Sequence, residues 1–360
     1  MSELLVLGIE TSCDDTSVCL LKGQSGIYGS FPQVLAHNAF SQETMLSKWG
    51  GVVPEIAARN HLEKIAPLLE QTVKEAALKP SDIDLIAVTT NPGLLGPLLT
   101  GINAAKAMSL LHHKAIFPVN HLYAHLEAVH LTEKVGYPYL GLLVSGGHSL
   151  YLLVRSPSEF EMLGTTIDDA AGEAFDKGGK LMGLGYPAGR LIDELAKKGE
   201  KTRFKFPIGL RSSGNADLSF SGVKTSLRLF LEENPGYFCQ DKENPNQDHF
   251  DVCASYQECI VAALSLKLGY AVKIAKEKYS LSHLPIVVGG GVACNSALRE
   301  RLQKDCKSIY FVKPSLCTDN GAMIANYGLR RADEAITFPE CLELDAKERF
   351  LDKSKVQERV

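Results

Sequence analysis

Two histidines four positions apart, His121 and His125, are the residues of this sequence best suited to bind a metal. Asn120 precedes them and is a favourable N-cap, so both are expected in the first turns of a helix. This spacing places both imidazoles on one helix face, where they can bind the same ion. The sequence contains 10 histidines, so such a pair also arises by chance, and an exposed polar helix face is the alternative.

Asp319 is the candidate third ligand, because it follows an expected strand at 309–312 and precedes an apolar helix. An Asp in this position is also a common helix N-cap, and that alternative stays open. A zinc peptidase would need Glu directly after the first histidine as its general base, and this sequence has Leu122 there. The pattern therefore disfavours a peptidase.

Glycines follow two expected strands and could bring backbone amides close to a phosphate. Ser145, Gly146 and Gly147 follow the strand at 139–144, and the glycines at 289–291 are followed by Asn295. A plain hairpin turn and a plain strand-to-helix turn are the structural alternatives. Neither segment has the Gly-Lys-Ser/Thr ending of a P-loop.

The elements around these residues form a repeated pattern. Strands at 4–9 and 17–21 flank a short polar turn, and strands at 139–144 and 150–154 flank another, about 135 positions later. Strands alternate with helical patterns elsewhere, so an α/β protein with two similar lobes is expected. We assign 1–115 to an N-terminal lobe, closed by a helix near 322–335, 116–321 to a C-terminal lobe, and 340–360 to a charged, mobile tail.

Composition narrows the class of protein. The 360 residues carry a formal net charge of −4, which disfavours a strongly basic protein that coats nucleic acid. Nine scattered cysteines without a Cys-x-x-Cys pair indicate reduced, mostly buried thiols rather than a zinc finger. The sequence shows no membrane-length apolar run and no signal-peptide or transit-peptide pattern at its start, so a cytoplasmic protein is expected.

Several motifs occur together in one order, and together they are far more specific than any one alone. They are Gly8-Ile9-Glu10-Thr11-Ser12-Cys13-Asp14-Asp15-Thr16, the segment 50–55, His121 with His125, and the segments 144–148, 167–177, 220–225 and 317–325. This set resembles the universal tRNA threonylcarbamoyltransferase family, formerly labelled O-sialoglycoprotein endopeptidase. The resemblance covers residues from about 5 to 335. It implies the actin/Hsp70/sugar-kinase-like fold, with two lobes each built on a ribonuclease-H-like mixed sheet.

The resemblance also implies a reaction. The threonylcarbamoyl group moves from threonylcarbamoyl-AMP to the exocyclic N6 amine of the adenosine 3′-adjacent to the anticodon, in tRNAs that read ANN codons, and AMP leaves. His121, His125 and Asp319 are implied as ligands of one Fe²⁺ or Zn²⁺ per subunit. A general base is not identified; the candidates are Glu10, Asp14 and Asp15. The implied adenylate contacts are Leu143, Val144, Ser145, Gly146, Gly147, Asp176, Gly189 and Asn295.

The implied partners are tRNA, a degenerate paralogue of the same fold (TsaB) and a small ATPase (TsaE), with the adenylate supplied by a TsaC-type synthase. In isolation a homodimer is conceivable, and no membrane is involved. A basic run of Lys197, Lys201, Arg203, Lys205 and Arg211 is a candidate contact for tRNA or simply a solvated loop. An ATPase or sugar kinase of the same fold and a non-enzymatic scaffold are the remaining alternatives. Residues 23–48 form a longer segment than we expect for a bacterial member.

Overall fold

The computed structural model describes residues 3–26 and 31–347, and the chain divides into two compact units. Unit 1 contains residues 1–134 and 319–360, and unit 2 contains residues 135–318. The boundary expected at residue 115 was too early. The strand that begins there pairs within the first sheet, and the helix after it belongs to unit 1 as well. Both candidate histidines therefore belong to the same unit as Asp319.

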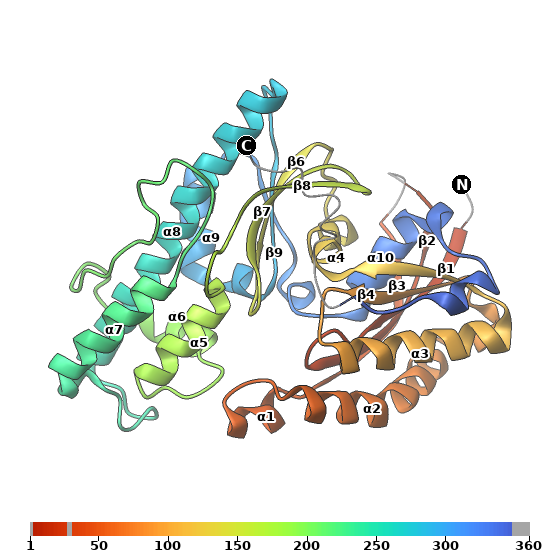
Figure 1. The fold of residues 1–360 in the computed structure, drawn as a ribbon, viewed down its shortest axis with the longest axis horizontal. Coiled ribbons are helices and arrows are strands. Elements are labelled where there is room, and N and C mark those ends of the chain that lie inside the picture. The colour runs from red at the N-terminus through yellow and green to blue at the C-terminus, as the bar shows by residue number, and fades with distance from the viewer. Residues whose placement is uncertain (1–2, 27–30, 348–360) are drawn as a thin grey trace. The chain divides into compact units, whose positions relative to one another are not determined.

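Unit 1 is built on a five-stranded mixed sheet in the order β3-β2-β1-β4-β5 (Figure 1). β1, β2 and β3 form an antiparallel meander, and β4 and β5 are parallel to β1. Its strands are β1 Glu3–Glu10, β2 Asp15–Gln24, β3 Gln33–Ser41, β4 Leu85–Asn91 and β5 Ala115–Asn120; its helices are α1 Glu43–Leu46, α2 Pro54–Glu75, α3 Leu95–His112, α4 His121–Glu127 and α10 Gly321–Arg330.

Helices cover both faces of this sheet, because the central strand β1 is buried on both sides. Successive side chains of a strand point to opposite faces. Gly8 faces the backbone of α10, and its neighbour Ile9 packs toward Gly101 of α3. α2 packs beside α3 (Figure 1). Asp319 directly precedes the residues that begin α10, so the packing of α10 on β1 determines where Asp319 lies.

We predict that Gly8→Ala destabilises the protein by about 1–3 kcal/mol or more, the usual range for overpacking. A Cβ at this position would lie 2.2 Å from the Gly321 carbonyl oxygen and 2.6 Å from the Ala325 nitrogen, and backbone atoms cannot move aside cheaply. Urea unfolding of both proteins measures the difference. Gly136→Ala is the control, since a Cβ there meets no atom within 4 Å. An unchanged stability of Gly8→Ala would show that α10 is not packed on β1 in this way.

Unit 2 repeats the topology of unit 1. Its sheet has the order β10-β9-β6-β7-β8, with an antiparallel meander of β6, β7 and β8 and with β9 and β10 parallel to β6. The expected duplication and the α/β class are confirmed. The strands are β6 Tyr139–Val144, β7 Ser149–Ser156, β8 Glu159–Thr165, β9 Ile286–Gly289 and β10 Ile309–Phe311; the helices are α5 Ala171–Leu181, α6 Gly189–Ala196, α7 Ser221–Glu233, α8 Gln247–Tyr279 and α9 Ser296–Asp305.

The long helix α8 holds unit 2 together through buried tyrosine hydroxyls. Tyr151 of β7 donates to the Leu264 carbonyl oxygen at 2.7 Å, and Tyr256 of α8 donates to the Ala174 carbonyl oxygen of α5 at 2.8 Å. A buried hydroxyl must be hydrogen-bonded, so these two bonds fix the sheet and α5 to one helix. Among the described residues, no helix combines the length and apolar character needed to cross a bilayer.

The expectation of a mobile tail from residue 340 is wrong for its first residues. Cys341, in the short helix Glu340–Glu343, is fully buried in the core of unit 1. The backbone N–H of Lys347 donates to the Thr90 carbonyl oxygen at 2.9 Å. The apolar residues Leu342 and Leu344 also pack against this core, although charged residues surround them in the sequence. Residues 348–360 of the expected tail lie outside the described residues.

Candidate metal centre

The helix α4 presents both histidines from its first turns. The Asn120 side-chain oxygen accepts from the N–H groups of Leu122 at 3.0 Å and Tyr123 at 3.2 Å, so Asn120 is the N-cap as predicted. His121 and His125 are 7% and 1% exposed, which excludes the alternative of an exposed polar face. Leu122 is fully buried.

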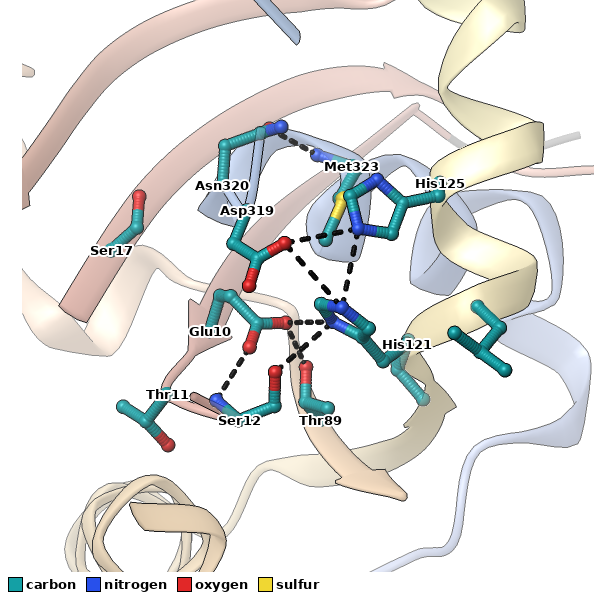
Figure 2. A network of polar contacts seen from close by, with 12 residues as sticks. Glu10, Thr11, Ser12, Ser17, Thr89, His121, His125, Asp319, Asn320 and Met323 are labelled. Carbon is teal, nitrogen blue, oxygen red and sulfur yellow. Dashed lines mark hydrogen bonds and ion pairs between the residues drawn. The ribbon is translucent and has the colours of Figure 1, made fainter. Parts of the chain in front are cut away.

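Asp319 meets these histidines because Asn320, and not Asp319, caps α10. The Asn320 side-chain oxygen accepts from the Met323 N–H at 2.9 Å. The Asp319 Oδ1 atom lies 3.0 Å from His125 Nε2 and 3.4 Å from His121 Nε2. The two Nε2 atoms lie 3.2 Å apart, and the three side chains converge in Figure 2. Among the described residues, these three side chains bring their ligand atoms close enough together to hold one metal ion.

The three donor atoms fit a divalent transition metal. Two ligands bound tetrahedrally to zinc at about 2.0–2.1 Å lie roughly 3.3 Å apart, close to the separations in this triangle. Two imidazoles with one carboxylate are also the donor set of non-haem iron(II) sites that keep open coordination positions. The donor set therefore suits iron or zinc and leaves positions open for a ligand.

Glu10, a candidate base, is fully buried behind His121. Its Oε2 atom lies 3.1 Å from His121 Nδ1 and accepts from the Thr89 hydroxyl at 2.5 Å. Its Oε1 atom accepts from the Ser12 N–H at 2.6 Å. A carboxylate on Nδ1 keeps the proton on that nitrogen and leaves Nε2 free to bind a metal. The geometry thus gives Glu10 a positioning contact, which the sequence analysis missed, although Glu10 lies in the same motif as the other candidates.

The electrostatics of this cluster favour a positive charge between the two carboxylates. Burial alone would lower the pKa of His121, but Asp319 and Glu10 outweigh burial and raise it to about 9. Burial lowers the pKa of His125, and the nearby His121 lowers it further. Burial would raise the pKa of Glu10, yet His121 holds it below its ordinary value.

Asp14 and Asp15 lie in the turn between β1 and β2, which α2 holds in place. His61 of α2 bonds the Thr16 hydroxyl through Nδ1 at 2.7 Å and the Cys13 carbonyl oxygen through Nε2 at 3.0 Å. Burial and the negative charge of Asp319 raise the pKa of Asp14. Burial is also the main reason that the pKa of Asp15 rises to about 7. Their role as base stays a prediction.

The raised pKa of Asp15 gives a prediction for the metal-free protein. The folded state binds this proton more tightly than the unfolded chain, so the stability from Asp15 is fully present below about pH 4 and is lost as the pH rises to about 7. Asp15→Asn should therefore raise the free energy of unfolding by about 2–4 kcal/mol at pH 8, with little effect near pH 4. Urea unfolding across this range tests it. A difference between variant and wild type that does not change with pH would contradict it.

In unit 2, the two glycine segments predicted to bind the adenylate meet the start of α5 at one end of the sheet. Leu143 and Val144 end β6 and are fully buried, so they offer a ligand backbone groups rather than side chains. A Cβ on Gly290 would lie 2.4 Å from the Val144 carbonyl oxygen, which only glycine permits. The Gly172 N–H of α5 donates to the Ser145 carbonyl oxygen at 3.2 Å. The exposed Gly146 and Gly147 lie in the same turn.

Asp176 and Gly189 also lie together, on α5 and at the start of α6. Asp176 Oδ1 accepts from the Ala188 N–H at 2.9 Å and also from the Gly189 N–H, while burial raises the pKa of Asp176. Asn295 is buried, caps α9 through the Leu298 N–H at 2.9 Å, and donates to Gln257 at 2.7 Å. Its side chain is therefore already used within unit 2.

Two further motifs are joined through the acids at 168–169, a link the sequence analysis did not foresee. Asp168 accepts from the N–H and hydroxyl of Ser221 at 3.3 and 2.8 Å, at the start of α7. Asp169 pairs with Lys177 of α5 and with Lys224 of α7, each at 2.7 Å. The segments 167–177 and 220–225 thus form one polar network. Within it, the two lysines neutralise Asp169, and neutral N–H and hydroxyl groups bind Asp168.

Acidic side chains partly neutralise the positive charges of the expected basic run. Arg203 pairs with Asp248 and Asp251, Lys201 lies 3.6 Å from Glu258, and Lys197 lies 3.9 Å from Asp193. Acidic neighbours reduce the positive potential that a phosphate backbone would meet. The contact of this run with tRNA stays a prediction.

The fold belongs to the class of two-lobed proteins built on duplicated ribonuclease-H-like sheets, as solved structures confirm. Component A of (R)-2-hydroxyglutaryl-CoA dehydratase from Acidaminococcus fermentans superposes with a TM-score of 0.52 at 15% identity, over 92% of this chain and all of that chain. Full-length HypF gives a TM-score of 0.56 at 13% identity, over 92% of this chain and 47% of that chain. At such low identity the likeness concerns the fold alone, and it confirms the actin/Hsp70/sugar-kinase-like architecture.

Sequence comparisons define the family within this class. The profile of the TsaD family, tRNA N6-adenosine threonylcarbamoyltransferase, matches residues 33–326. Proteins with that name from Brucella canis and Rhizobium etli are 40% and 41% identical to the chain, over 96% of it and over 94% and 93% of their own lengths. The chain belongs to the tRNA N6-adenosine threonylcarbamoyltransferase family. It is an enzyme of tRNA threonylcarbamoyladenosine modification, as the resemblance implied.

Proposed function

We propose that this enzyme takes the threonylcarbamoyl group from threonylcarbamoyl-AMP and transfers it to the N6 amine of the adenosine 3′-adjacent to the anticodon, in tRNAs that read ANN codons. AMP is the second product. The observation that carries the proposal is the convergence of His121, His125 and Asp319 in a chain of this family. The glycine segments of unit 2 support an adenylate as the donor, because they leave backbone amides accessible to phosphate.

The proposed metal is one Fe²⁺ or Zn²⁺ per chain, held by His121 Nε2, His125 Nε2 and an Asp319 oxygen. When bound, such an ion supplies Lewis-acid polarisation of a carbonyl or phosphoryl oxygen and stabilises charge that develops there. Glu10 keeps the Nδ1 proton of His121 in place through their 3.1 Å contact, so Nε2 points its lone pair toward the other two ligands.

The attacking N6 amine is a poor nucleophile, so orientation of the two substrates is expected to supply much of the rate. In unit 2, Asp176 holds the first residues of α6, and the turn at 145–147 lies beside the beginning of α5. Both arrangements are fixed by hydrogen bonds within unit 2. Among the acids, Asp14 and Asp15 are the candidates to accept a proton, because their raised pKa values lie nearer to neutral pH.

The alternative activities have less support. A zinc peptidase needs an acidic base at position 122, and Leu122 is fully buried. A phosphoryl-transferring kinase or ATPase of this fold would not need the two histidines and the aspartate that converge in unit 1. A non-enzymatic scaffold would not need them either.

The proposed partners are tRNA, a degenerate paralogue of the TsaB type and an ATPase of the TsaE type, with a TsaC-type synthase as the source of adenylate. The net charge of −4 supports help from partners in tRNA binding. The reaction takes place on tRNA, so we place the enzyme in the cytoplasm.

The experiment incubates the purified chain and its partner proteins with enzymatically made threonylcarbamoyl-AMP and an unmodified tRNA that reads ANN codons. Nuclease digestion and mass spectrometry then look for threonylcarbamoyladenosine. Its formation, with AMP released in equal amount, is the expected result. Its absence with metal and partners present, together with phosphoryl transfer to a small alcohol, would favour the kinase instead.

A further inference from the structure

Unit 2 brings two cysteines together on neighbouring turns. Cys294 ends the short helix Gly291–Cys294, and Cys317 follows the short helix Pro314–Leu316. The Cys294 Sγ atom lies 3.9 Å from the Pro314 carbonyl oxygen, at the start of the second turn. The Cys317 thiol donates to the Val312 carbonyl oxygen at 3.2 Å, and each cysteine shifts the pKa of the other, so the two side chains lie close together.

Arg299 of α9 joins the two turns and lies beside both sulfur atoms. Its Nε–H donates to the Ala293 carbonyl oxygen at 2.6 Å, next to Cys294, and its Nη2 donates to the Val312 carbonyl oxygen at 3.1 Å. The Cys317 Sγ atom contacts the same Val312 carbonyl oxygen at 3.2 Å. The positions of both cysteines are therefore fixed by one arginine rather than by chance contact of mobile loops.

The two thiols differ in access to solvent. Cys294 is exposed, whereas Cys317 is fully buried. The neighbouring Cys317 and the positive charge of Arg299 lower the pKa of Cys294 to about 6, which favours its thiolate. The thiolate is the reactive form of cysteine, and exposed thiolates are the ones that oxidants attack. Cys317 is shielded from oxidants and can react only with its neighbour.

We propose that Cys294 and Cys317 form a reversible dithiol–disulfide pair, with Cys294 as the residue attacked by peroxide and Cys317 as the resolving thiol. In the first step the Cys294 thiolate takes one oxygen from hydrogen peroxide, the O–O bond breaks, and a sulfenic acid and water form after protonation. In the second step the Cys317 sulfur attacks the sulfenic acid, the S–O bond breaks, and a second water leaves with the Cys317 proton. Two thiols are oxidised and one peroxide is reduced, and a dithiol reductant reverses the change.

The disulfide would act on the predicted adenylate site. Cys294 lies between the glycines at 289–291 and Asn295, which caps α9. A covalent bond to Cys317 fixes this turn against the segment that leads to Asp319. We therefore expect the oxidised enzyme to transfer more slowly, an effect that rests on the proposed function of this site.

The test treats the reduced, full-length chain with hydrogen peroxide, blocks free thiols with iodoacetamide, and maps cysteines by mass spectrometry. A peptide pair linked through Cys294 and Cys317 is the expected product in the wild type and in Cys306→Ser, which removes a half-buried thiol elsewhere. The link should be absent in Cys294→Ser. Free, alkylated Cys294 after treatment, or its pairing with any other cysteine, would overturn the proposal.

The second arm measures threonylcarbamoyl transfer before oxidation, after oxidation and after dithiothreitol. The activity of the wild type should fall about tenfold or more on oxidation, a factor that corresponds to about 1.4 kcal/mol, and should return on reduction. Cys294→Ser should keep its activity under peroxide, which separates the disulfide from oxidation of a bound metal. A disulfide that leaves activity unchanged would overturn its regulatory role. Reduced enzyme that makes no threonylcarbamoyladenosine would count against the proposed function instead, since the peptide map does not depend on it.

Discussion

Replacement of His121 by alanine is expected to remove the bound metal and to lower threonylcarbamoyl transfer by about two orders of magnitude or more, the usual cost of losing a principal electrostatic stabiliser. His121 supplies one of three converging donor atoms, 3.2 Å from His125 Nε2 and 3.4 Å from Asp319 Oδ1. Two remaining ligands cannot hold the ion against solvent. Metal content by plasma mass spectrometry and the rate of adenosine modification are the two measurements.

The buried position of His121 makes controls necessary, because its loss leaves the buried Glu10 without its ion-pair partner and could unfold unit 1. Asp319→Asn removes another ligand at a more exposed position and keeps the shape of the side chain, so it should lose metal and activity with an unchanged far-ultraviolet spectrum. His283→Ala removes an exposed imidazole and should keep both. Full activity of a folded His121→Ala protein would show that the metal centre is elsewhere.

The exchange of Glu10 for glutamine should weaken metal binding about 10–100-fold, the range found when a partner of a metal-bound histidine is removed. The Glu10 carboxylate accepts from the Ser12 N–H, the Thr89 hydroxyl and His121 Nδ1. A glutamine has one accepting oxygen. If that oxygen stays on Ser12, its amide N–H groups face His121, the ring proton moves to Nε2, and the nitrogen that should bind the metal is blocked.

Competition with a chelator of known affinity measures the apparent metal dissociation constant of Glu10→Gln. The same change at Glu75, an exposed carboxylate of α2 in the same unit, should leave that constant unchanged. Excess metal should restore transfer in Glu10→Gln, since the three ligands remain. If the rate stays low with metal fully bound, Glu10 takes part in the reaction itself rather than positioning His121.

The fold was largely readable from the sequence because its central strands are continuous apolar runs. β1 and β6 are buried on both faces along most of their length and were predicted as strands from their continuous apolar runs. The i,i+4 histidines and the Asn120 cap were also readable, since helix geometry alone places them. These features depend on local spacing, and local spacing is visible in a sequence.

The features that were missed depend on contacts between distant segments. β3 is an edge strand in which Ala36 alone is buried and His37 and Asn38 interrupt the apolar residues, so its sequence lacks the continuous apolar run that marked β1. The boundary between the units could not be seen because β5 pairs with β4, about 30 positions earlier. The role of Glu10 depends on His121, which is 111 positions away. Sequence could not show that Asp319 is not the cap of α10, because this depends on the Met323 N–H, which donates to the Asn320 side chain.

X-ray absorption at the metal edge tests the central claim most directly, on the full-length protein loaded with one equivalent of Fe²⁺ or Zn²⁺. We expect a first shell of nitrogen and oxygen at about 2.0–2.2 Å, with outer-shell scattering from two imidazole rings and no sulfur near 2.3 Å. In Asp319→Asn this spectrum should be lost together with the bound metal. A sulfur shell, or the spectrum of two imidazoles retained unchanged in His121→Ala, would contradict a metal centre formed by His121, His125 and Asp319.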